Sequence, residues 1–241
     1  MIITIHQPEH LPWLGYFNKM AKAETYVILD NVPFRKNYVQ NRNRILGTNG
    51  VQWLGVPVLI SGHIEGTIKT TRIAVETQPK WKIKYLKTLE QSYKKYPYFD
   101  EVFSDIESVI NQDWDSISDL NFSLLKLFAD KMNICPQFVF ASDLDVSGNK
   151  SDLILDICKA LNTDTYIAGP SGRRYLDKQS FKDAKIEVVY NDYNHPEYPQ
   201  KRTTEFVSHL SSVDLFMNVG YKEAFEYIFE NKDIICIRLL V

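Results

Sequence analysis

The sequence predicts an α/β fold with a mostly parallel, Rossmann-like sheet and a helical insertion in the middle of the chain. Short apolar runs rich in β-branched residues alternate with amphipathic segments at both ends of the chain, the order typical of βα units. Three consecutive helical patterns separate these two ends, at about residues 80–133. No internal repeat or low-complexity linker divides the chain. We therefore expect one domain over residues 1–241.

The first part of the chain begins as a strand–helix–strand unit. Residues 2–5 are apolar and β-branched, residues 11–22 are amphipathic, and residues 26–30 form a second apolar run that ends in Asp30. Short links between them favour a parallel crossover. The polar, basic stretch that follows is too irregular for a helix. We expect further strands at residues 51–58 and 68–75, joined by a turn around Gly62.

The remaining elements follow from the same periodicities. Apolar residues at steps of three and four predict helices at residues 80–95, 98–111 and 116–133. A helix at residues 151–161 has Ser151 or Asn149 as its expected cap. Apolar runs predict strands at 138–141, 166–168 and 186–190, helices near 211–218 and 221–230, and a final strand or packed arm at 234–241.

Composition and charge exclude several classes of protein. Lys and Arg total 28 against 30 acids, a net charge of −2, whereas nucleic-acid binding requires a basic surface. No run approaches 18 apolar residues and no leader pattern opens the chain, so we expect neither a membrane span nor export. Cys135, Cys158 and Cys236 lack CxxC spacing, which predicts no disulfide framework or zinc site and favours the reducing cytoplasm.

The first candidate site follows the first strand. His6 titrates near neutrality and is the candidate general base, while Gln7, Glu9 and Trp13 are candidate substrate-binding residues. His10 is a weaker candidate. The alternative is that these side chains only satisfy backbone groups at a strand end. Because neither HExxH nor a facial triad is present, no metal site is predicted.

The second candidate site is the polar stretch 30–44. Asp30 ends a strand, where α/β enzymes place a catalytic or ribose-binding acid. Arginine forks bind phosphate or carboxylate groups, and amides bind sugar or base edges. We predict that Arg35, Arg42, Asn43 and Arg44 bind an anionic substrate. An ordinary solvated loop is the alternative.

The third candidate site follows the strand at 166–168. Gly169 and Gly172 allow a tight turn, and N–H groups at a helix start can hold an anion, with Ser171 and Arg173 beside them. It is not a P-loop, because no GK[ST] follows.

The fourth candidate site is the loop after residues 186–190. His195 is a second candidate acid or base, and Tyr198 a candidate substrate contact. A proline-stiffened surface loop is the alternative. If the sheet is parallel, all four stretches open at one edge and form one crevice.

The same stretches resemble the WbqC-like proteins. The matching motifs cover nearly the whole chain: HQP through WLGYF at residues 6–17, NRNR at 41–44, GPSG at 169–172, HPEYPQ at 195–200, SVDL at 212–215 and NVG at 218–220. His10 stands where that family usually has an aromatic residue, which makes His6 the better catalytic candidate.

The resemblance implies a cytoplasmic enzyme of surface-polysaccharide (O-antigen) biosynthesis. The activity that we favour is transfer of an acyl or aminoacyl group to the amine of a nucleotide-linked amino sugar. His6, or alternatively His195, would remove the amine proton, and backbone amides near Gly169 and Gly172 would hold the oxyanion or pyrophosphate. Arg42, Arg44 and Arg173 would clamp phosphates. No bound cofactor is implied, and the donor would be a thioester of coenzyme A or of an acyl carrier protein.

Two other functions stay open. The strand–histidine loop–helix unit is similar to nucleotidyltransferase-type folds, in which paired histidines contact the phosphates of ATP, and such a fold could also bind pantetheine donors. A sugar-binding protein of the same pathway would use its aromatic residues without catalysis.

Overall fold

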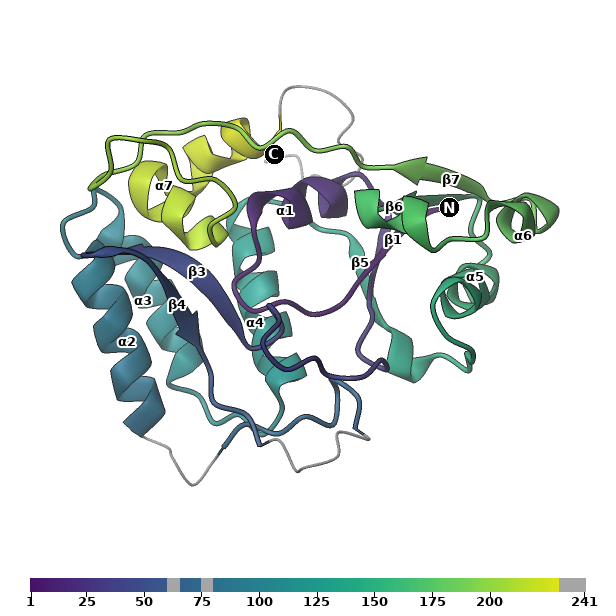
Figure 1. Cartoon of the computed structure of the whole chain (residues 1–241), viewed down its shortest axis with the longest axis horizontal. Coiled ribbons are helices and arrows are strands. Elements are labelled where there is room, and N and C mark those ends of the chain that lie inside the picture. The colour runs from purple at the N-terminus through teal and green to yellow at the C-terminus, as the bar shows by residue number, and fades with distance from the viewer. Residues whose placement is uncertain (60–65, 75–79, 230–241) are drawn as a thin grey trace.

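The fold is built around a parallel five-stranded sheet with the strand order β5-β2-β1-β6-β7, which confirms the predicted class (Figure 1). The structure is a computed structural model that describes residues 1–59, 66–74 and 80–229. The predicted turn at Gly62 and the tail at 234–241 lie outside these residues. The strands are β1 (Ile2–His6), β2 (Thr25–Ile28), β5 (Gln137–Phe140), β6 (Thr165–Ala168) and β7 (Glu187–Tyr190).

The sheet is covered by helices on both faces because its side chains alternate between two cores. Ile3, Ile5 and Val27 point to the face covered by α5 (Ser151–Ala160) and α6 (Lys178–Asp183). Tyr26 and Ile28 point to the other face, covered by α1 (Leu14–Ala21), α4 (Ile117–Lys131) and α7 (Ser212–Ile228). The chain runs outward from β1 through β2 to β5, then returns to the other side of β1 with β6.

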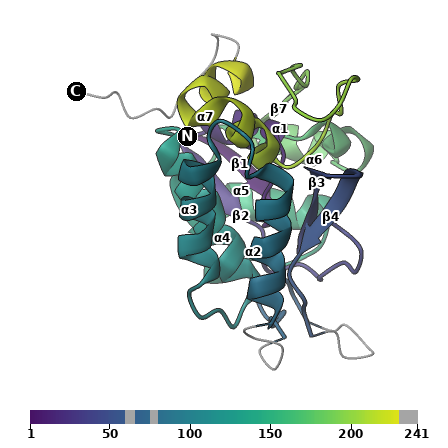
Figure 2. The ribbon, with the colours of Figure 1, turned by 90° about the vertical axis from the view of Figure 1, so that its left-hand side faces the viewer.

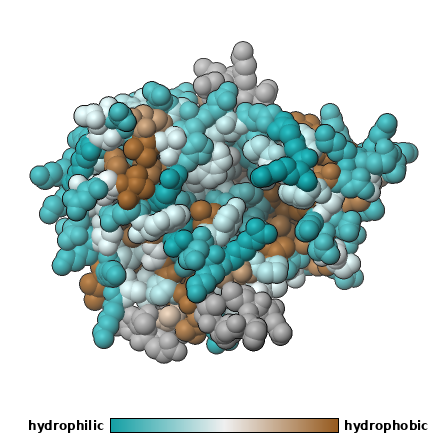
Figure 3. Space-filling view, in the orientation of Figure 1, coloured by the Kyte–Doolittle hydropathy of each residue, from teal (hydrophilic) through white to brown (hydrophobic). Residues whose placement is uncertain are grey.

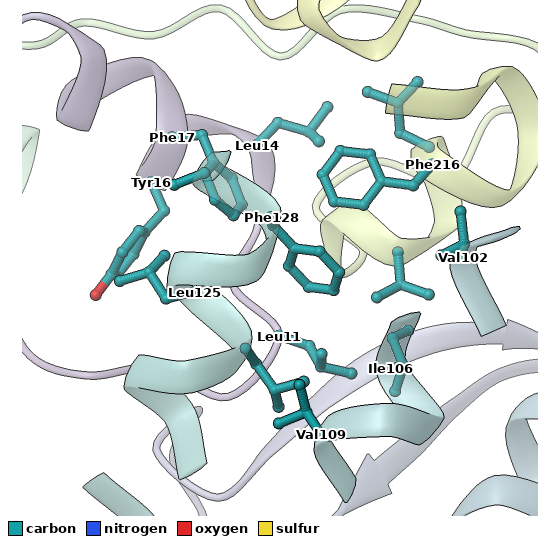
Figure 4. Close-up of a cluster of buried hydrophobic side chains, with 14 of the residues drawn as sticks. Leu11, Leu14, Tyr16, Phe17, Val102, Ile106, Val109, Leu125, Phe128 and Phe216 are labelled. Carbon is teal, nitrogen blue, oxygen red and sulfur yellow. The ribbon is translucent and has the colours of Figure 1, made fainter. Parts of the chain in front are cut away.

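The core between α1, α4 and α7 is aromatic (Figure 4). Phe17, Phe128 and Phe216 pack with ring centroids 5.1–6.4 Å apart. Tyr16 packs its ring beside this cluster and points its hydroxyl away from it. The apolar side chains of α1 thus fix this helix in the core. The helix can therefore hold a polar side chain such as Lys19 at a defined place against β1.

The three central helices appear where the sequence predicted them, as α2 (Lys80–Tyr93), α3 (Phe99–Ile110) and α4. They stand side by side, with α2 against a hairpin of β3 (Arg42–Gly47) and β4 (Gly50–Gly55) (Figure 2). Strand β3 was not predicted; it is joined to β4 by a two-residue turn, Thr48-Asn49, between the paired Gly47 and Gly50. The predicted strand 68–75 is wrong: over residues 68–74 the chain forms only isolated bridges, one joining Val58 to Ile73.

Other boundaries differ for local reasons. The first helix begins at Leu14 rather than at residue 11, because Leu11 has a φ of 42° and Pro12 follows it. Neither predicted residue caps α5: its N-cap is Lys150, and the Ser151 hydroxyl accepts a hydrogen bond from the Asp177 N–H instead. Helix α6 was not predicted.

The two helices predicted near the C-terminus are present as the two halves of α7, which meet at a kink. Gly220 makes the kink with a φ of 76°. A Cβ at this position would lie 2.6 Å from the Tyr98 ring, so both the backbone and the packing require glycine.

Hydrophilic side chains cover most of the face shown in Figure 3, and apolar ones gather in small separate patches. Within residues 1–59, 66–74 and 80–229, no helix is long and apolar enough to cross a membrane.

Candidate functional site at the carboxyl edge of the sheet

The parallel sheet brings the predicted loops to one edge. The β1–β6 pairing of Thr4 with Ile167, continued by two residues, sets His6 opposite Gly169. Ile28 pairs with His6, and Ala168 pairs with Tyr190. The loops after β1, β2, β6 and β7 therefore leave the same edge. The strand order reverses between β1 and β6, which is where open α/β sheets bind their ligands.

Three ionisable side chains meet at this point, and we call them the β1-edge cluster: His6, Glu9 and Lys19. The His6 Nε2 lies 3.9 Å from the Glu9 Oε1. The Lys19 Nζ, carried by α1, donates to the Ile5 carbonyl at 3.0 Å. The side chain of His6 is 32% exposed, whereas that of Glu9 is 8% exposed, so His6 lies at the opening of the cluster. Lys19 is the deepest of the three residues, at 4% exposure.

Burial shifts the pKa of each member of the cluster. It raises the pKa of Glu9 to about 8, against the opposing field of the Lys19 ammonium. Burial lowers the pKa of Lys19 to about 7, which the nearby Glu9 carboxylate partly offsets. Burial and then the Lys19 charge hold the pKa of His6 well below its usual range. Glu9 and Lys19 can therefore both exchange protons near neutral pH, where the His6 imidazole is unprotonated.

The Glu9 side chain is 8% exposed, and its carboxyl group has no hydrogen-bond donor among the residues that the structure describes. The His6 Nδ1 is likewise buried and unpartnered within the same residues. A buried atom without a partner, such as the His6 Nδ1, carries a desolvation cost of about 1–3 kcal/mol. Because the Glu9 carboxyl group and the His6 Nδ1 lie next to the opening of the cluster, they are candidates for contact with a bound molecule.

The loop between β1 and α1 is held rigid by amide side chains from elsewhere in the chain. Asn43 Nδ2 donates to the carbonyl oxygens of His10 and Leu11, at 3.3 and 2.9 Å. The Tyr16 hydroxyl donates to the Gln7 carbonyl at 3.0 Å. Asn43 was predicted to bind substrate, but it is buried and bound to the protein backbone in this way.

His10 belongs to the protein interior. Its Nδ1 lies 2.9 Å from Asn121 Oδ1 and its Nε2 lies 2.8 Å from the Tyr85 hydroxyl. The Asn121 oxygen can only accept, so the Nδ1 carries the proton and the Tyr85 hydroxyl donates to the Nε2. Burial lowers the pKa of His10 to about 4, so the ring is neutral and both nitrogens are occupied. His10 therefore joins the loop to α4 and does not face the site.

Asp30 joins two strand ends. Its carboxylate accepts from the Ser142 N–H at 2.9 Å and from the Ser142 hydroxyl at 2.8 Å, and its side chain is 1% exposed. Ser142 follows β5, so this contact connects the ends of β2 and β5. Both carboxylate oxygens already have protein donors, which favours a structural role over the predicted catalytic one.

Three of the predicted phosphate-binding arginines have partners in the protein. Arg42 donates to the Asn37 carbonyl at 3.0 Å and lies over the Trp53 ring at 4.3 Å. Arg44 donates to the His209 carbonyl at 3.0 Å. Arg173 forms a two-pronged ion pair with Asp192, with both distances at 2.6 Å. The side chain of Arg35 is exposed, and its backbone N–H donates to Gln40.

The turn after β6 is a short 3-10 helix, Pro170–Arg174, and not the start of an α-helix. Pro170 has no N–H, and the Gly172 N–H donates to the Gly169 carbonyl at 2.9 Å. These groups are thus unavailable to the predicted oxyanion. A Cβ at Gly169 would meet no atom within 4 Å, so the space in front of it is open, whereas Gly172 is closely packed. Ser171 is exposed.

His195 lies in an aromatic cluster with Trp13, Tyr193 and His209, which brings two predicted site residues together. The Trp13 ring stacks on His209 at 5.4 Å and on His195 at 6.3 Å between ring centroids. The His195 Nδ1 lies 2.9 Å from the Pro196 carbonyl, and its Nε2 accepts from the His209 N–H at 3.2 Å. Both nitrogens are therefore occupied and the ring is neutral; burial lowers its pKa.

Tyr198 belongs to the same loop as His195, and its side chain is buried. Its hydroxyl donates to Asp214 Oδ2 at 3.0 Å, and the Tyr93 hydroxyl donates to Asp214 Oδ1 at 2.9 Å. Asp214 is 0% exposed. Tyr198 thus anchors the loop to α7, and its hydroxyl does not face a ligand.

A pocket of about 390 Å³ lies between α6 and β7, away from the β1-edge cluster. None of the predicted site residues lines it. Within the described ranges, no three His, Cys, Asp or Glu residues are grouped so that they could hold a metal ion.

Sequence reasoning missed Lys19, Gln40 and Asn121. A signal for Lys19 was present in the sequence: it is the one charged residue of the segment Leu14–Ala21. Asn121 gave no such signal, because an amide on a helix of mixed pattern reads as a surface residue.

The fold and the site define a doubly wound α/β protein with an acid–base cluster at its topological switch point. The chain belongs to the WbqC-like protein family, whose model matches residues 7–226. It is also similar to the uncharacterized protein Rv1507c of Mycobacterium tuberculosis, with 28% identity over 227 residues, 94% of this chain and 96% of the relative. No solved structure matches the chain.

Proposed function

We propose that the protein is a cytoplasmic transferase that binds a substrate amine at the β1-edge cluster and transfers an acyl or aminoacyl group to it. The observation that carries this proposal is the pairing of the His6 Nε2 and the Glu9 Oε1, 3.9 Å apart. This separation is too long for a hydrogen bond between them. An amine placed between them can donate to the neutral imidazole and to the Glu9 carboxyl oxygen together.

Acid–base chemistry at the cluster follows from the pKa shifts. A group is most effective in proton transfer when its pKa lies near the working pH. Glu9, with a pKa of about 8, can take up a proton from a substrate ammonium group, and Lys19 can return a proton near pH 7. His6 would contact the amine first, since it is the exposed member of the cluster.

The substrate class that we propose is a nucleotide-linked amino sugar, used in surface-polysaccharide biosynthesis. The family membership supports this class through the resemblance described above, and the amine is the part that the cluster itself favours. The acyl donor would be a thioester of coenzyme A or of an acyl carrier protein. Nucleotidyl transfer receives less support, because His10, one of the two histidines that it needs, is occupied by Asn121 and Tyr85.

The test compares ligands that differ only at the amine: UDP-glucosamine, UDP-N-acetylglucosamine and UDP-glucose, by thermal shift and calorimetry. At 100 times its dissociation constant a ligand stabilises the fold by about 2.7 kcal/mol. We expect UDP-glucosamine to bind most tightly, and Glu9→Gln and His6→Ala to remove this preference. The exposed Glu223→Gln is the matched control and should keep it. Equal binding of the three sugars would contradict the proposal.

A further inference from the structure

A chain of two hydrogen bonds, from Arg35 through Gln40 to Gln7, fixes the direction of the Gln7 side chain. The Arg35 backbone N–H donates at 2.6 Å to the Gln40 Oε1, so the Gln40 amide can have only one orientation. The Gln40 Nε2 then donates at 2.8 Å to the Gln7 side-chain oxygen. The Gln7 carboxamide must therefore direct its NH₂ group away from Gln40.

The residues of this chain are held in place through their main chains as well. The Gln40 carbonyl accepts from Asn121 Nδ2 at 2.7 Å, and Gln40 is 0% exposed. The Gln7 carbonyl accepts from the Tyr16 hydroxyl at 3.0 Å. The His10 N–H donates to the Val39 carbonyl at 2.9 Å, joining the two loops that carry Gln7 and Gln40. The direction of the Gln7 amide is thus set before any ligand binds.

The Gln7 Nε2 has no hydrogen-bond acceptor among the residues that the structure describes, and its side chain is half-buried. A fixed and unused donor at the carboxyl end of the central strand is suited to an acceptor oxygen on a ligand. Because this donor is already oriented, little reorganisation is needed when negative charge develops on the ligand oxygen.

We propose that the Gln7 side-chain NH₂ donates to the carbonyl oxygen of the acyl donor, and that Gln40 is the positioning residue that orients it. This inference rests on the proposed function, because it takes the donor to be an acyl thioester. The amine nitrogen forms a bond to the carbonyl carbon, and the carbonyl oxygen takes up the negative charge. The carbon–sulfur bond then breaks, the thiolate leaves, and the proton lost by the amine protonates it. Gln7 supplies the oxyanion contact that the turn at Gly169 does not.

The orientation is tested with Gln40→Glu. A carboxylate at this position still accepts from the Arg35 N–H, but its other oxygen faces the Gln7 oxygen, so we expect the Gln7 amide to rotate. In ¹⁵N-labelled protein, the Gln7 NH₂ signal should have solvent-like proton shifts in the wild type. In Gln40→Glu one proton should move downfield and exchange more slowly. Identical Gln7 signals in the two proteins would overturn the positioning role.

The recognition is tested with acetyl-coenzyme A and S-ethyl-coenzyme A, which lacks the carbonyl oxygen. We expect the wild type to bind acetyl-coenzyme A about tenfold more tightly. Gln7→Met, which keeps the volume without the donor, and Gln40→Glu should both bind the two probes equally. Equal affinity in the wild type, or no binding of acetyl-coenzyme A, would overturn the inference. If UDP-glucosamine still binds most tightly in the sugar panel after such a result, the role of Gln7 fails and the amine site of the proposed function stands. If that preference is absent as well, the proposed function also fails.

Discussion

At the scale of single residues, burial separates the two histidines that the sequence presents together. His6 and His10 are four positions apart in one loop, yet only His6 lies at an opening, and His10 has both nitrogens bonded inside the protein. The sequence could predict that imidazoles follow the first strand. It could not predict which of them is free, because Asn121 and Tyr85 approach from helices more than seventy residues away.

The first prediction concerns His10. His10→Ala leaves the Asn121 amide and the Tyr85 hydroxyl buried without their partner, so we expect a loss of about 2–4 kcal/mol in the free energy of unfolding. Urea unfolding measures it. His6→Ala is the comparison and should cost under about 1 kcal/mol, because the His6 Nδ1 has no partner to lose. Equal costs for the two variants would contradict the assignment of His10 to the structure.

The second prediction concerns pH. The pKa of Glu9 is raised on folding to about 8, so between about pH 4.5 and 8 the folded state binds a proton that the unfolded state has lost, and stability falls as pH rises. Glu9→Gln removes this term. The variant should gain stability relative to the wild type as pH rises towards 8, by about 1 kcal/mol or more. Thermal unfolding across this range measures the difference, and parallel pH profiles would contradict a buried, protonated Glu9.

At the scale of elements, the buried strands β1 and β2 were predictable from the sequence, and the hairpin strand β3 was not. The strands β1 and β2 are mostly apolar, whereas β3 opens with three polar residues, Arg42–Arg44, and resembles a loop in sequence. Consequently Asn43 and Arg44 were interpreted as ligand-binding residues. In the strand their side chains point to opposite faces, Asn43 inward to the loop before α1 and Arg44 outward to His209.

The third prediction separates two glycines of the turn after β6. A Cβ at Gly172 would lie 3.0 Å from Leu176 and 3.2 Å from Ala168, whereas a Cβ at Gly169 would contact nothing. We expect Gly172→Ala to lose about 1–3 kcal/mol of stability and Gly169→Ala to change it by less than about 0.5 kcal/mol. If a ligand fills the open space in front of Gly169, Gly169→Ala should still weaken binding of UDP-glucosamine. Unchanged binding would place the ligand elsewhere on this edge.

At the scale of the whole molecule, the parallel order of the sheet was predictable and the convergence of the loops followed from it. The hydrogen bonds that attach the loop 191–211 to α7 were not predictable from the sequence. The Asp214 carboxylate on α7 accepts hydrogen bonds from Tyr93 on α2 and from Tyr198 and Gln200 in the loop. A buried carboxylate requires several such donors. Tyr93 lies more than a hundred positions before the other three residues, so the sequence gives no sign that they meet.

The fourth prediction concerns this network. Asp214→Asn replaces an acceptor of three hydrogen bonds with a side chain that also carries donors, so we expect a loss of about 2–4 kcal/mol in stability. The loop that holds His195 should exchange its amide hydrogens faster. Hydrogen exchange followed by mass spectrometry measures it, with the exposed Asp145→Asn as a control. Unchanged exchange in residues 191–211 would show that Asp214 does not anchor the loop.

In the proposed function, the acid–base cluster at the switch point exchanges protons near neutral pH. The most direct measurement is an NMR titration of the Lys19 ε-carbon, assigned with Lys19→Met. We expect a midpoint near pH 7, and a lower midpoint in Glu9→Gln, since the Glu9 carboxylate raises the pKa of Lys19. A midpoint near 10.5 in both proteins would mean that Lys19 is an ordinary ammonium, and the proposed acid–base role of the cluster would be wrong.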